Sequence, residues 1–361
     1  MGVALRSAPS KPRHPRRFLL PITTPPMEAR LVDGLPDEPG WQFEPKWDGF
    51  RCLAFKAGDQ VDLRAKSGKP LGRYFPEIVD QLRDLSVDRF VLDGELAIPV
   101  GDSLSFDSLQ MRLHPAESRI RKLSQETPAL FILFDLVASS AAGDLSGEPL
   151  ARRREALEAF VGSLAGRAGR LRLSPFTRKA AEAKRWLARA GGALDGVVAK
   201  RSDRPYEAGE RAMLKVKRLR TADCVVGGFR RESNSSLVGS LLLGLYDADG
   251  QLDHVGFTAA IKDAERAALT KRLEPLAGAP GFTGKAPGGP SRWSNGRSAD
   301  WQPLKPKLVV EVRYDHVTGD RFRHGAAFVR WRPDKAPRQC TFDQLELEAR
   351  PSRLVAKILK S

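Results

Sequence analysis

The chain has 361 residues, 41% of them hydrophobic, and carries a formal net charge of +16 with a sequence pI near 10.0. This length allows two or three domains, each with its own core, and the charge favours a polyanionic partner, nucleic acid before an anionic membrane, over solubility alone. Three widely spaced cysteines and no apolar run of transmembrane length argue against a zinc site, a disulfide framework or a membrane span, and favour a reducing cytoplasm.

The N-terminal segment is basic and rich in proline. Its apolar part is too short for the core of a signal peptide, so we predict a flexible basic arm over residues 1–24. The remainder changes in texture near residue 218. We therefore predict one domain over residues 25–218 and a second over residues 219–361.

Strand and helix patterns alternate through the first of these domains. Strands are predicted at 41–46, 51–56, 61–66, 90–98, 129–137, 196–201 and 212–216, and helices at 76–85, 105–112, 150–164 and 180–190. The runs 90–98 and 129–137 are apolar and β-rich, which is typical of buried strands. The pattern predicts an α+β domain built on a mostly antiparallel sheet.

The second domain consists mainly of short strands. They are predicted at 224–229, 237–246, 254–258, 307–314 and 326–331, with one amphipathic helix at 263–274 that Pro275 stops and a Gly/Pro/Ser-rich stretch from 278 to about 299. A small barrel of about five strands with one inserted helix is the expected shape of an OB-fold. The Lys- and Arg-rich segment 215–220 is the predicted hinge between the domains.

The octet EPKWDGFR at residues 44–51 is the most informative stretch. A lysine becomes a nucleophile when it is held against an electrophile. Lys46 lies two residues from Asp48 and near Gly49 and Arg51, a mixture that suits the capture of a nucleotide phosphate. The alternative is a surface cluster that faces phosphate without chemistry.

Three later segments also combine chemistry with a strand pattern. In LDGE at 92–95, a carboxylate on an apolar strand is not expected to be buried without a partner, the alternative being an ordinary Asp-Gly turn. In FILFDL at 131–136, Phe134 is either a stacking platform or a core residue. In DGVVAK at 195–200, strand alternation places Lys200 on the face of Val198, where it meets a phosphate or is a surface lysine.

Two basic segments follow. Lys215 and Lys217 share one face of a strand, and like charges so close favour an anion between them, the alternative being a solvated strand edge. RWRPDK at 330–335 carries Arg332 and Lys335, which suit phosphate contact or a solvated loop.

In their order and spacing, these motifs resemble those of the ATP-dependent DNA ligases, within the covalent nucleotidyltransferase superfamily that also includes RNA ligases and mRNA capping enzymes. The resemblance runs from about Pro25 to the end, and residues 314–325 are similar to the compact bacterial ligase C type and to the ligase module of ligase D. It implies a nucleotidyltransferase (ATP-grasp-like) adenylation domain with antiparallel sheets, followed by a C-terminal OB-fold β-barrel.

The resemblance also implies roles for individual residues. Lys46 would attack ATP and carry AMP, which passes to a 5′-phosphate before a 3′-hydroxyl displaces it. Nucleotide contacts would come from Glu44 at the adenine amino group, Phe134 stacked on adenine, Arg51 at the ribose or 5′-phosphate, Glu95 at the ribose, and Lys200, Lys215, Lys217, Arg332 and Lys335 at phosphates. Glu95 and Asp195 would hold Mg²⁺ or Mn²⁺, and Asp48 and Lys66 would support nick sealing.

Two positions depart from the family pattern. Asp195 stands where glutamate is the commonest residue, and Lys66 stands where an arginine is expected. The shorter carboxylate alters the geometry of a metal contact, and lysine keeps the charge without the bidentate fork.

As a whole, the resemblance implies a monomer that acts on nicked double-stranded DNA in repair or end joining, with Ku-like or repair proteins as partners, in the bacterial cytoplasm at the nucleoid. The alternatives are an RNA ligase, a GTP-dependent capping nucleotidyltransferase, and an OB-fold protein that binds nucleic acid without catalysis.

Overall fold

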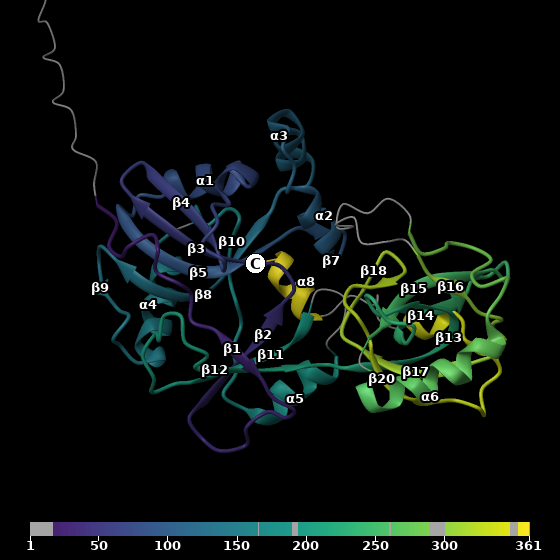
Figure 1. The fold of residues 1–361 in the computed structure, drawn as a ribbon. Helices are drawn as coiled ribbons and strands as arrows, with labels where there is room; N and C mark the ends of the chain where they lie inside the picture. The colour runs from purple at the N-terminus through teal and green to yellow at the C-terminus, as the bar shows by residue number, and fades with distance from the viewer. Residues whose placement is uncertain are drawn as a thin grey trace, which may run out of the picture. The chain divides into compact units, whose positions relative to one another are not determined.

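The computed structural model describes residues 17–164, 166–189, 194–259, 261–288, 300–346 and 353–360. The chain divides into two compact units (Figure 1). The first comprises Met1–Ala180, Val198–Lys215 and Lys357–Ser361, and the second comprises Ala181–Val197 and Val216–Ala356. None of the helices in the described ranges is both long and apolar enough to span a membrane.

The first unit is organised around a six-stranded sheet. Its order is β10 (Leu171–Leu173), β8 (Leu130–Ser139), β5 (Arg89–Ala97), β3 (Phe50–Ala57) and β4 (Gln60–Ala65), with the short β9 (Gly143–Asp144) paired to β8. All these pairs are antiparallel except β10 with β8. The predicted strands at 51–56, 61–66, 90–98 and 129–137 are confirmed to within about two residues at each end.

Both faces of this sheet are buried, which explains why its central strands are almost continuously apolar. Alternate residues such as Cys52 and Ala54 pack with the helices α1 (Pro76–Arg83) and α4 (Leu150–Ser163). Leu53 and Phe55 face the other way and pack with Phe18 and its neighbours up to Ile22. The part of the predicted arm within the described residues therefore lies on the core, and residues 1–16 lie outside them.

A second sheet has the order β1 (Ala29–Leu31), β12 (Met213–Lys217), β11 (Leu194–Arg201) and β2 (Trp41–Trp47). The boundary between the units runs through β11 and β12. A two-stranded ribbon, β6 (Pro99–Val100) with β7 (Ser103–Leu104), and the helices α2 (Phe106–Met111), α3 (Glu117–Glu126) and α5 (Ala180–Ala188) complete this part of the chain. The sequence did not predict α3, because few of its residues are apolar.

The second unit is built on β13 (Arg220–Arg231). The sheet order is β15 (Leu252–Thr258), β14 (Val238–Tyr246), β13, β17 (Val309–Tyr314) and β20 (Ala327–Trp331), with β16 (Gln302–Pro303) also paired to β13. The predicted antiparallel strands and the inserted helix α6 (Asp263–Leu273) are confirmed. Within the described residues the strands form an open path, so the predicted barrel is not closed by hydrogen bonds. Pro275 ends α6 at Leu273, but the chain continues in a 3-10 turn, Glu274–Leu276.

The remaining elements of this unit are small. They are β18 (Val317–Thr318), β19 (Arg321–Phe322), the 3-10 turn Pro337–Gln339 and the helix α7 (Asp343–Glu346), while α8 (Arg353–Lys360) lies at the C-terminal end of the chain. Between β12 and β13 only two residues, Arg218 and Leu219, lie outside a strand, so the predicted hinge 215–220 is mostly β-structure. Of the predicted loop 278–299, residues 289–299 lie outside the described residues.

Candidate active site

Lys46 lies near the end of β2, a strand whose other residues are mostly buried. Phe43 and Trp47 are buried on one face, and the indole of Trp47 donates a hydrogen bond to Oγ of Ser174 at 2.9 Å. Because side chains alternate along a strand, Lys46 projects from the opposite face together with the buried Glu44. The strand thus holds the backbone of the lysine firmly, while the lysine side chain is only partly buried.

Gly49 allows the turn from β2 into β3 to lie directly against β5. A Cβ at this position would be 2.3 Å from the carbonyl oxygen of Leu96 and 2.7 Å from Cγ of Glu95, so any other residue would collide. β3 then pairs with β5 so that Arg51 lies opposite Glu95. The glycine of the octet therefore brings the lysine motif against the LDGE motif.

Glu95 responds electrostatically to the octet. Its side chain keeps some exposure, yet the surrounding protein removes enough water to raise the pKa of Glu95 to about 7, against an ordinary value of 4.5. The positive charges of Lys46 and Arg51 oppose this rise, and the negative charge of Asp48 adds to it. A carboxylate in such a place is fully ionised at neutral pH only if a further cation lies beside it.

Arg51 is held by a buried carboxylate. Its Nε and Nη2 each donate to Asp93 at 2.6 Å, and the hydroxyl of Tyr206 donates to the same carboxylate at 2.6 Å. The backbone N–H of Met27 donates in turn to the Tyr206 oxygen at 3.1 Å. Burial would lower the pKa of Arg51, but Asp93 raises it above its ordinary value. A carboxylate on this apolar strand was expected to need a partner, and Asp93 has two, Arg51 and Tyr206.

Glu44 and Lys200 form a buried pair beside Phe134. Nζ of Lys200 lies 2.8 Å from Oε2 of Glu44, and Gln42 donates to Oε1 of Glu44 at 2.8 Å. Lys200 is 3% exposed, so the alternative of a surface lysine is wrong. Nζ of Lys200 and Cζ of Arg51 lie 4.6 Å and 4.5 Å from the ring centroid of Phe134. Cation–π contacts to the Phe134 ring therefore link Arg51 of the EPKWDGFR motif with Lys200 of the DGVVAK motif.

Two further candidates of the first unit, Lys66 and Lys215, lie close to Glu28. Nζ of Lys66 is 2.8 Å from the Glu28 carboxylate, and its hydrogen bond lowers the pKa of Glu28. The charge of Lys215 acts on Glu28 in the same direction. Lys215 is on β12, where its carbonyl accepts a hydrogen bond from Val32 at 3.0 Å. Asp48 is in the turn between β2 and β3, where its charge raises the pKa of Glu95.

In the second unit Lys217 lies between two carboxylates. Its Nζ is 3.3 Å from Asp195 and 2.9 Å from Asp315. Burial would lower the pKa of Lys217, but Asp195 and Asp315 raise it. Burial would raise the pKa of Asp315, but hydrogen bonds with Lys217 and His324 lower it to about 2. Gly196 has φ +148°, and a Cβ there would lie 2.0 Å from the carbonyl oxygen of Val216, so this motif also requires glycine.

Arg332 and Lys335 share one carboxylate. Nη1 of Arg332 donates to Asp223 at 2.8 Å, and Nζ of Lys335 lies 3.4 Å from the same side chain. Arg332 also donates to Asp334 at 2.8 Å, and this hydrogen bond lowers the pKa of Asp334 to about 2. The alternative of a wholly solvated loop is therefore wrong for Arg332, whose side chain is 18% exposed.

The structure thus gathers the predicted residues in two sets, each within its own unit. The first set contains Glu44, Lys46, Asp48, Arg51, Glu95, Phe134 and Lys200, with Lys66 and Lys215 near Glu28. The second contains Asp195 with Lys217, and Arg332 with Lys335. Sequence reasoning missed the carboxylates that neutralise these cations, namely Asp93, Asp223 and Asp315. Only Asp93 had a signal, its place on an apolar strand.

The side chains around Glu95 offer a metal ion few protein ligands. In the described ranges no three His, Cys, Asp or Glu side chains gather as a metal would require. A divalent cation at Glu95 would therefore take most of its ligands from elsewhere, such as phosphate oxygens and water. The raised pKa of Glu95 fits a cation, whose charge would favour the ionised carboxylate.

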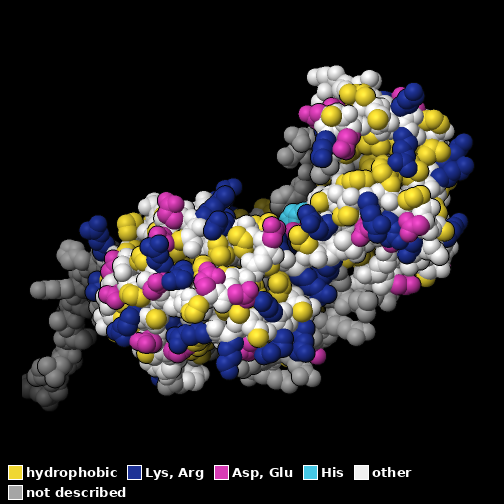
Figure 2. Space-filling model, turned by 90° about the horizontal axis from the view of Figure 1, so that it is seen from below, with side chains coloured by type: hydrophobic (Ala, Val, Ile, Leu, Met, Phe, Trp, Pro, Cys, Tyr) yellow, Lys and Arg dark blue, Asp and Glu magenta, His cyan; other side chains and the backbone are white. Residues whose placement is uncertain are grey.

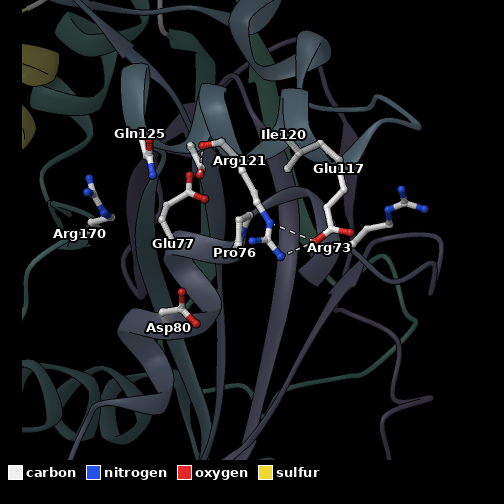
Figure 3. A pocket seen from close by; sticks show the side chains of 10 residues that line it. Arg73, Pro76, Glu77, Asp80, Glu117, Ile120, Arg121, Gln125 and Arg170 are labelled. Carbon is white, nitrogen blue, oxygen red and sulfur yellow. Dashed lines mark hydrogen bonds and ion pairs between the residues drawn. The ribbon is translucent and has the colours of Figure 1, made fainter.

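A separate hollow of about 690 Å³ lies between α1 and α3 (Figure 3). Charged side chains of both signs line it, among them Arg73, Glu77 and Arg121. Arg121 pairs with Glu117 at 2.6 Å, as the dashed lines show. None of the predicted site residues lines this hollow, so we assign it no part in the chemistry.

Two family models match the chain in succession. The ATP dependent DNA ligase domain matches residues 28–217, and the ATP dependent DNA ligase C terminal region matches residues 234–335. The first match alone spans more than half of the chain. Its limits include every predicted residue from Glu44 to Lys217, and the second includes Arg332 and Lys335.

Individual proteins agree with these matches. DNA ligase C of Mycobacterium tuberculosis (strain ATCC 25618 / H37Rv) is 46% identical over 344 residues, which are 91% of this chain and 95% of that protein. The multifunctional non-homologous end joining protein LigD of Mycobacterium bovis (strain ATCC BAA-935 / AF2122/97) is 30% identical over 82% of this chain and 37% of its own length. A solved structure from a study of Lig E DNA ligases shares the fold, with a TM-score of 0.52 at 15% identity, over 85% of this chain and 100% of that one.

Proposed function

This chain belongs to the ATP-dependent DNA ligase family, and from that premise we propose that it seals nicks in duplex DNA through a lysyl-adenylate on Lys46. The observation that carries the proposal is the position of Lys46. It projects from an anchored strand, and its charge acts on Glu95 of a second motif. A nucleophile held in this way needs only a correctly placed phosphate.

The proposed reaction has three in-line transfers. The neutral amine of Lys46 attacks the α-phosphorus of ATP, and pyrophosphate leaves. An oxygen of the 5′-phosphate at the nick then attacks the AMP phosphorus, which releases Lys46 and joins AMP to the DNA. Finally the 3′-hydroxyl attacks the 5′-phosphorus, loses its proton, and displaces AMP. Each transfer depends on positioning and charge neutralisation more than on acid–base chemistry.

We assign the surrounding residues to the substrates as follows. The proposed nucleotide contacts are Glu44 at the adenine amino group, Phe134 under the base, Arg51 at the ribose or 5′-phosphate, Glu95 at the ribose, and Lys200, Lys215, Lys217, Arg332 and Lys335 at phosphates. Asp48 and Lys66 would support the later steps. Support comes from the carboxylates that Arg51, Lys200 and Lys217 already bind, since phosphate oxygens offer the same chemistry to these cations.

We also propose that Mg²⁺ or Mn²⁺ takes part, and that the carboxylates of Glu95 and Asp195 are its protein ligands. When bound, the cation would neutralise charge on the transferring phosphate. Its binding to Glu95 is favoured because this carboxylate, with a pKa near 7, is short of positive charge. The carboxylate of Asp195 already lies 3.3 Å from Lys217, so a metal there would share it with the lysine.

Our proposed domain division is a basic arm over 1–24, an adenylation domain over 25–218 and an OB-fold domain over 219–361, with a hinge at 215–220. The limits of the two family matches, 28–217 and 234–335, support it. The boundary between the compact units at Lys215 and Val216 also supports the hinge. Rotation there would let Arg332 and Lys335 serve the first transfer and leave before DNA binds.

The proposed partner is nicked duplex DNA, held through its phosphates without sequence preference. Repair or end joining is the proposed setting, supported by the relative named as a multifunctional end-joining protein. We propose a monomer that works at the nucleoid and is recruited by Ku-like or repair proteins.

The first experiment follows label from the nucleotide to Lys46. Wild-type protein is incubated with Mg²⁺ and either ATP or GTP carrying an α-phosphate label, beside Lys46→Ala and the charge-preserving Lys46→Arg. We expect ATP alone to label the wild type and neither variant to be labelled, while both variants bind nicked duplex within about twofold of wild type. If wild type takes no label from ATP, the ligase proposal is wrong.

The second experiment separates the alternative functions. Nicked duplexes with DNA or RNA on either side of the nick are offered to the adenylated protein. Sealing of the all-DNA nick supports the proposal, and sealing that requires RNA favours an RNA ligase. Labelling by GTP would favour a capping enzyme. Binding of the duplex without any labelling would favour a non-catalytic protein.

A further inference from the structure

Three strands of the second unit place Arg230 and Phe257 on one face. In the pairing of β13 with β14, Arg230 lies opposite Ser240, and in the pairing of β14 with β15, Leu242 lies opposite Phe257. Directly paired residues project from the same face of a sheet, and so do residues two apart along a strand. The side chains of Arg230, Ser240 and Phe257 therefore emerge together, although they are far apart in sequence.

These side chains line a hollow of about 650 Å³, which we name the Arg230 pocket. Arg231, Glu232 and Ser233 also line it. Phe257 is 39% exposed, which is unusual for a phenylalanine in a strand. Glu232 is the one acid among the described residues that line the pocket, and its carboxylate lies 3.1 Å from Arg266 of α6.

Arg230 has hydrogen-bonding capacity that the described residues do not use. Its Nε is buried and has no hydrogen-bond partner in the described part of the chain. Burial lowers the pKa of Arg230, and the nearby charge of Arg321 lowers it further. A half-buried guanidinium that has no carboxylate partner among the described residues and lies near the charge of Arg321 is costly, and an anion beside it would relieve that cost.

His254 shows that this neighbourhood holds donors and excess positive charge. Arg321 lies 2.9 Å from Nδ1 of His254, and because a guanidinium can only donate, Nδ1 accepts. Nε2 must then carry the ring proton, and it is buried without a hydrogen-bond partner among the described residues. Burial and the charges of Arg321 and Arg230 lower the pKa of His254 to about 3, so the ring stays neutral.

The acids nearest along the chain do not supply the missing anion. Asp253 precedes His254, and Asp320 precedes Arg321. Nζ of Lys285 lies 3.5 Å from Asp253 and 3.6 Å from Asp320. Both carboxylates are therefore already turned to a cation of their own.

We propose that the Arg230 pocket binds a phosphate ester of the nucleic-acid backbone, with the neighbouring nucleotide packed against Phe257. An arginine fork suits a phosphate, and an exposed aromatic ring suits the flat face of a base or the edge of a sugar. Free pyrophosphate has the same anionic chemistry but offers the ring no base or sugar. ATP offers both, and the test therefore includes the KM for ATP. The inference rests on the proposed function, since it names where on this chain the substrate duplex is held.

The test measures binding of a nicked duplex that ends in a 3′-dideoxynucleotide, so that no sealing occurs. Fluorescence anisotropy gives the Kd of adenylated wild type, Arg230→Gln, Arg230→Lys and Phe257→Leu at several salt concentrations. Lys271→Gln, which removes one charge from an exposed position of α6, is the matched control. Thermal melting shows that each variant is folded.

Arg230→Gln is expected to weaken binding about tenfold and to reduce the slope of log Kd against log salt by about 1. Arg230→Lys should keep the slope and weaken binding less. Phe257→Leu should weaken binding about fivefold at an unchanged slope, because stacking is not ionic. Lys271→Gln should remain within about twofold of wild type.

Adenylation by ATP is measured on the same proteins and should be unchanged in all of them. If Arg230→Gln binds the duplex as wild type does, with the same slope, the pocket proposal is overturned. It is also overturned if the variant instead raises the KM for ATP, since the pocket would then take a free nucleotide. Failure of the wild type itself to adenylate or to bind a nick would overturn the proposed function instead.

Discussion

Carboxylates hold most of the cations to which we assign phosphates. Arg51 binds Asp93, Lys200 binds Glu44, and Lys217 lies between Asp195 and Asp315. Each pair keeps a charge oriented in the absence of substrate, and a phosphate must share or displace the carboxylate. Buried pairs of this kind add little net stability, so their value lies in positioning.

Glu95 should make stability depend on pH. Its pKa is about 7 in the folded protein and 4.5 ordinarily, so between these values the folded chain keeps a proton that the unfolded chain releases. Stability therefore falls as pH rises through this window. Without metal, Glu95→Gln should be more stable than wild type by about 1 to 3 kcal/mol at pH 8 and equal to it below pH 4.5. Urea denaturation across pH checks this, and parallel curves for the two proteins would contradict it.

The same residue predicts a response to metal that does not depend on activity. At pH 8, Mg²⁺ should raise the Tm of wild type more than that of Glu95→Gln, because only the wild type has a carboxylate for the cation to ionise. Thermal melting with and without Mg²⁺ measures this. Equal shifts in the two proteins would place the metal away from Glu95.

The Arg51–Asp93 pair should be sensitive to loss of its charge. Asp93→Asn leaves the Arg51 guanidinium unpaired and should cost about 3 kcal/mol in the free energy of unfolding. Tyr206→Phe removes one hydrogen bond to the same carboxylate and should cost about 1 kcal/mol. Urea denaturation gives both values. Equal costs would mean that hydrogen bonding rather than charge holds this network.

At the scale of elements, the buried Arg112 connects the helices α1, α2 and α3 through hydrogen bonds. Arg112 follows α2 and is fully buried. Its Nη2 donates to Glu77 of α1 at 2.6 and 2.7 Å, and its Nη1 donates to the carbonyl of Thr127 at the end of α3 at 3.1 Å. Short helices with few apolar residues are thus fixed by one polar network rather than by a wide hydrophobic face.

Removing this arginine should destabilise the first unit strongly. Arg112→Met leaves Glu77 buried without its cation and should cost about 3 to 5 kcal/mol in the free energy of unfolding. Arg121→Met is the matched control, because the Arg121–Glu117 pair is exposed on α3 and should contribute less than about 1 kcal/mol. Denaturation in urea compares them. Similar losses of stability from both variants would show that Arg112 does not stabilise the contact between these helices.

At the scale of the whole molecule, the chain carries a formal net charge of +16. In Figure 2 the Lys and Arg side chains are scattered over the face shown, among Asp and Glu, rather than gathered in one patch. Many weak phosphate contacts are therefore expected to add to the strong ones.

This distribution predicts different salt dependence for the two activities. Raising KCl from about 50 to about 200 mM should weaken binding of nicked duplex by at least about 100-fold, because a protein that neutralises several backbone phosphates releases their counterions. Adenylation by ATP should change by less than about threefold, because its cations are partly buried pairs. Parallel titrations of both activities measure this, and an equal loss of both would contradict it.

Local pattern was enough to predict several features correctly. The strand that carries Lys46 and the apolar strands that carry Asp93 and Phe134 are encoded in short segments, so their approximate bounds and the family emerge from neighbouring residues. Contacts between distant segments were beyond that reasoning. Asp93 with Arg51, Glu44 with Lys200, and Arg230 beside Phe257 depend on strand register. The pKa of Glu95 follows from burial and from charges on other strands, which no single segment contains.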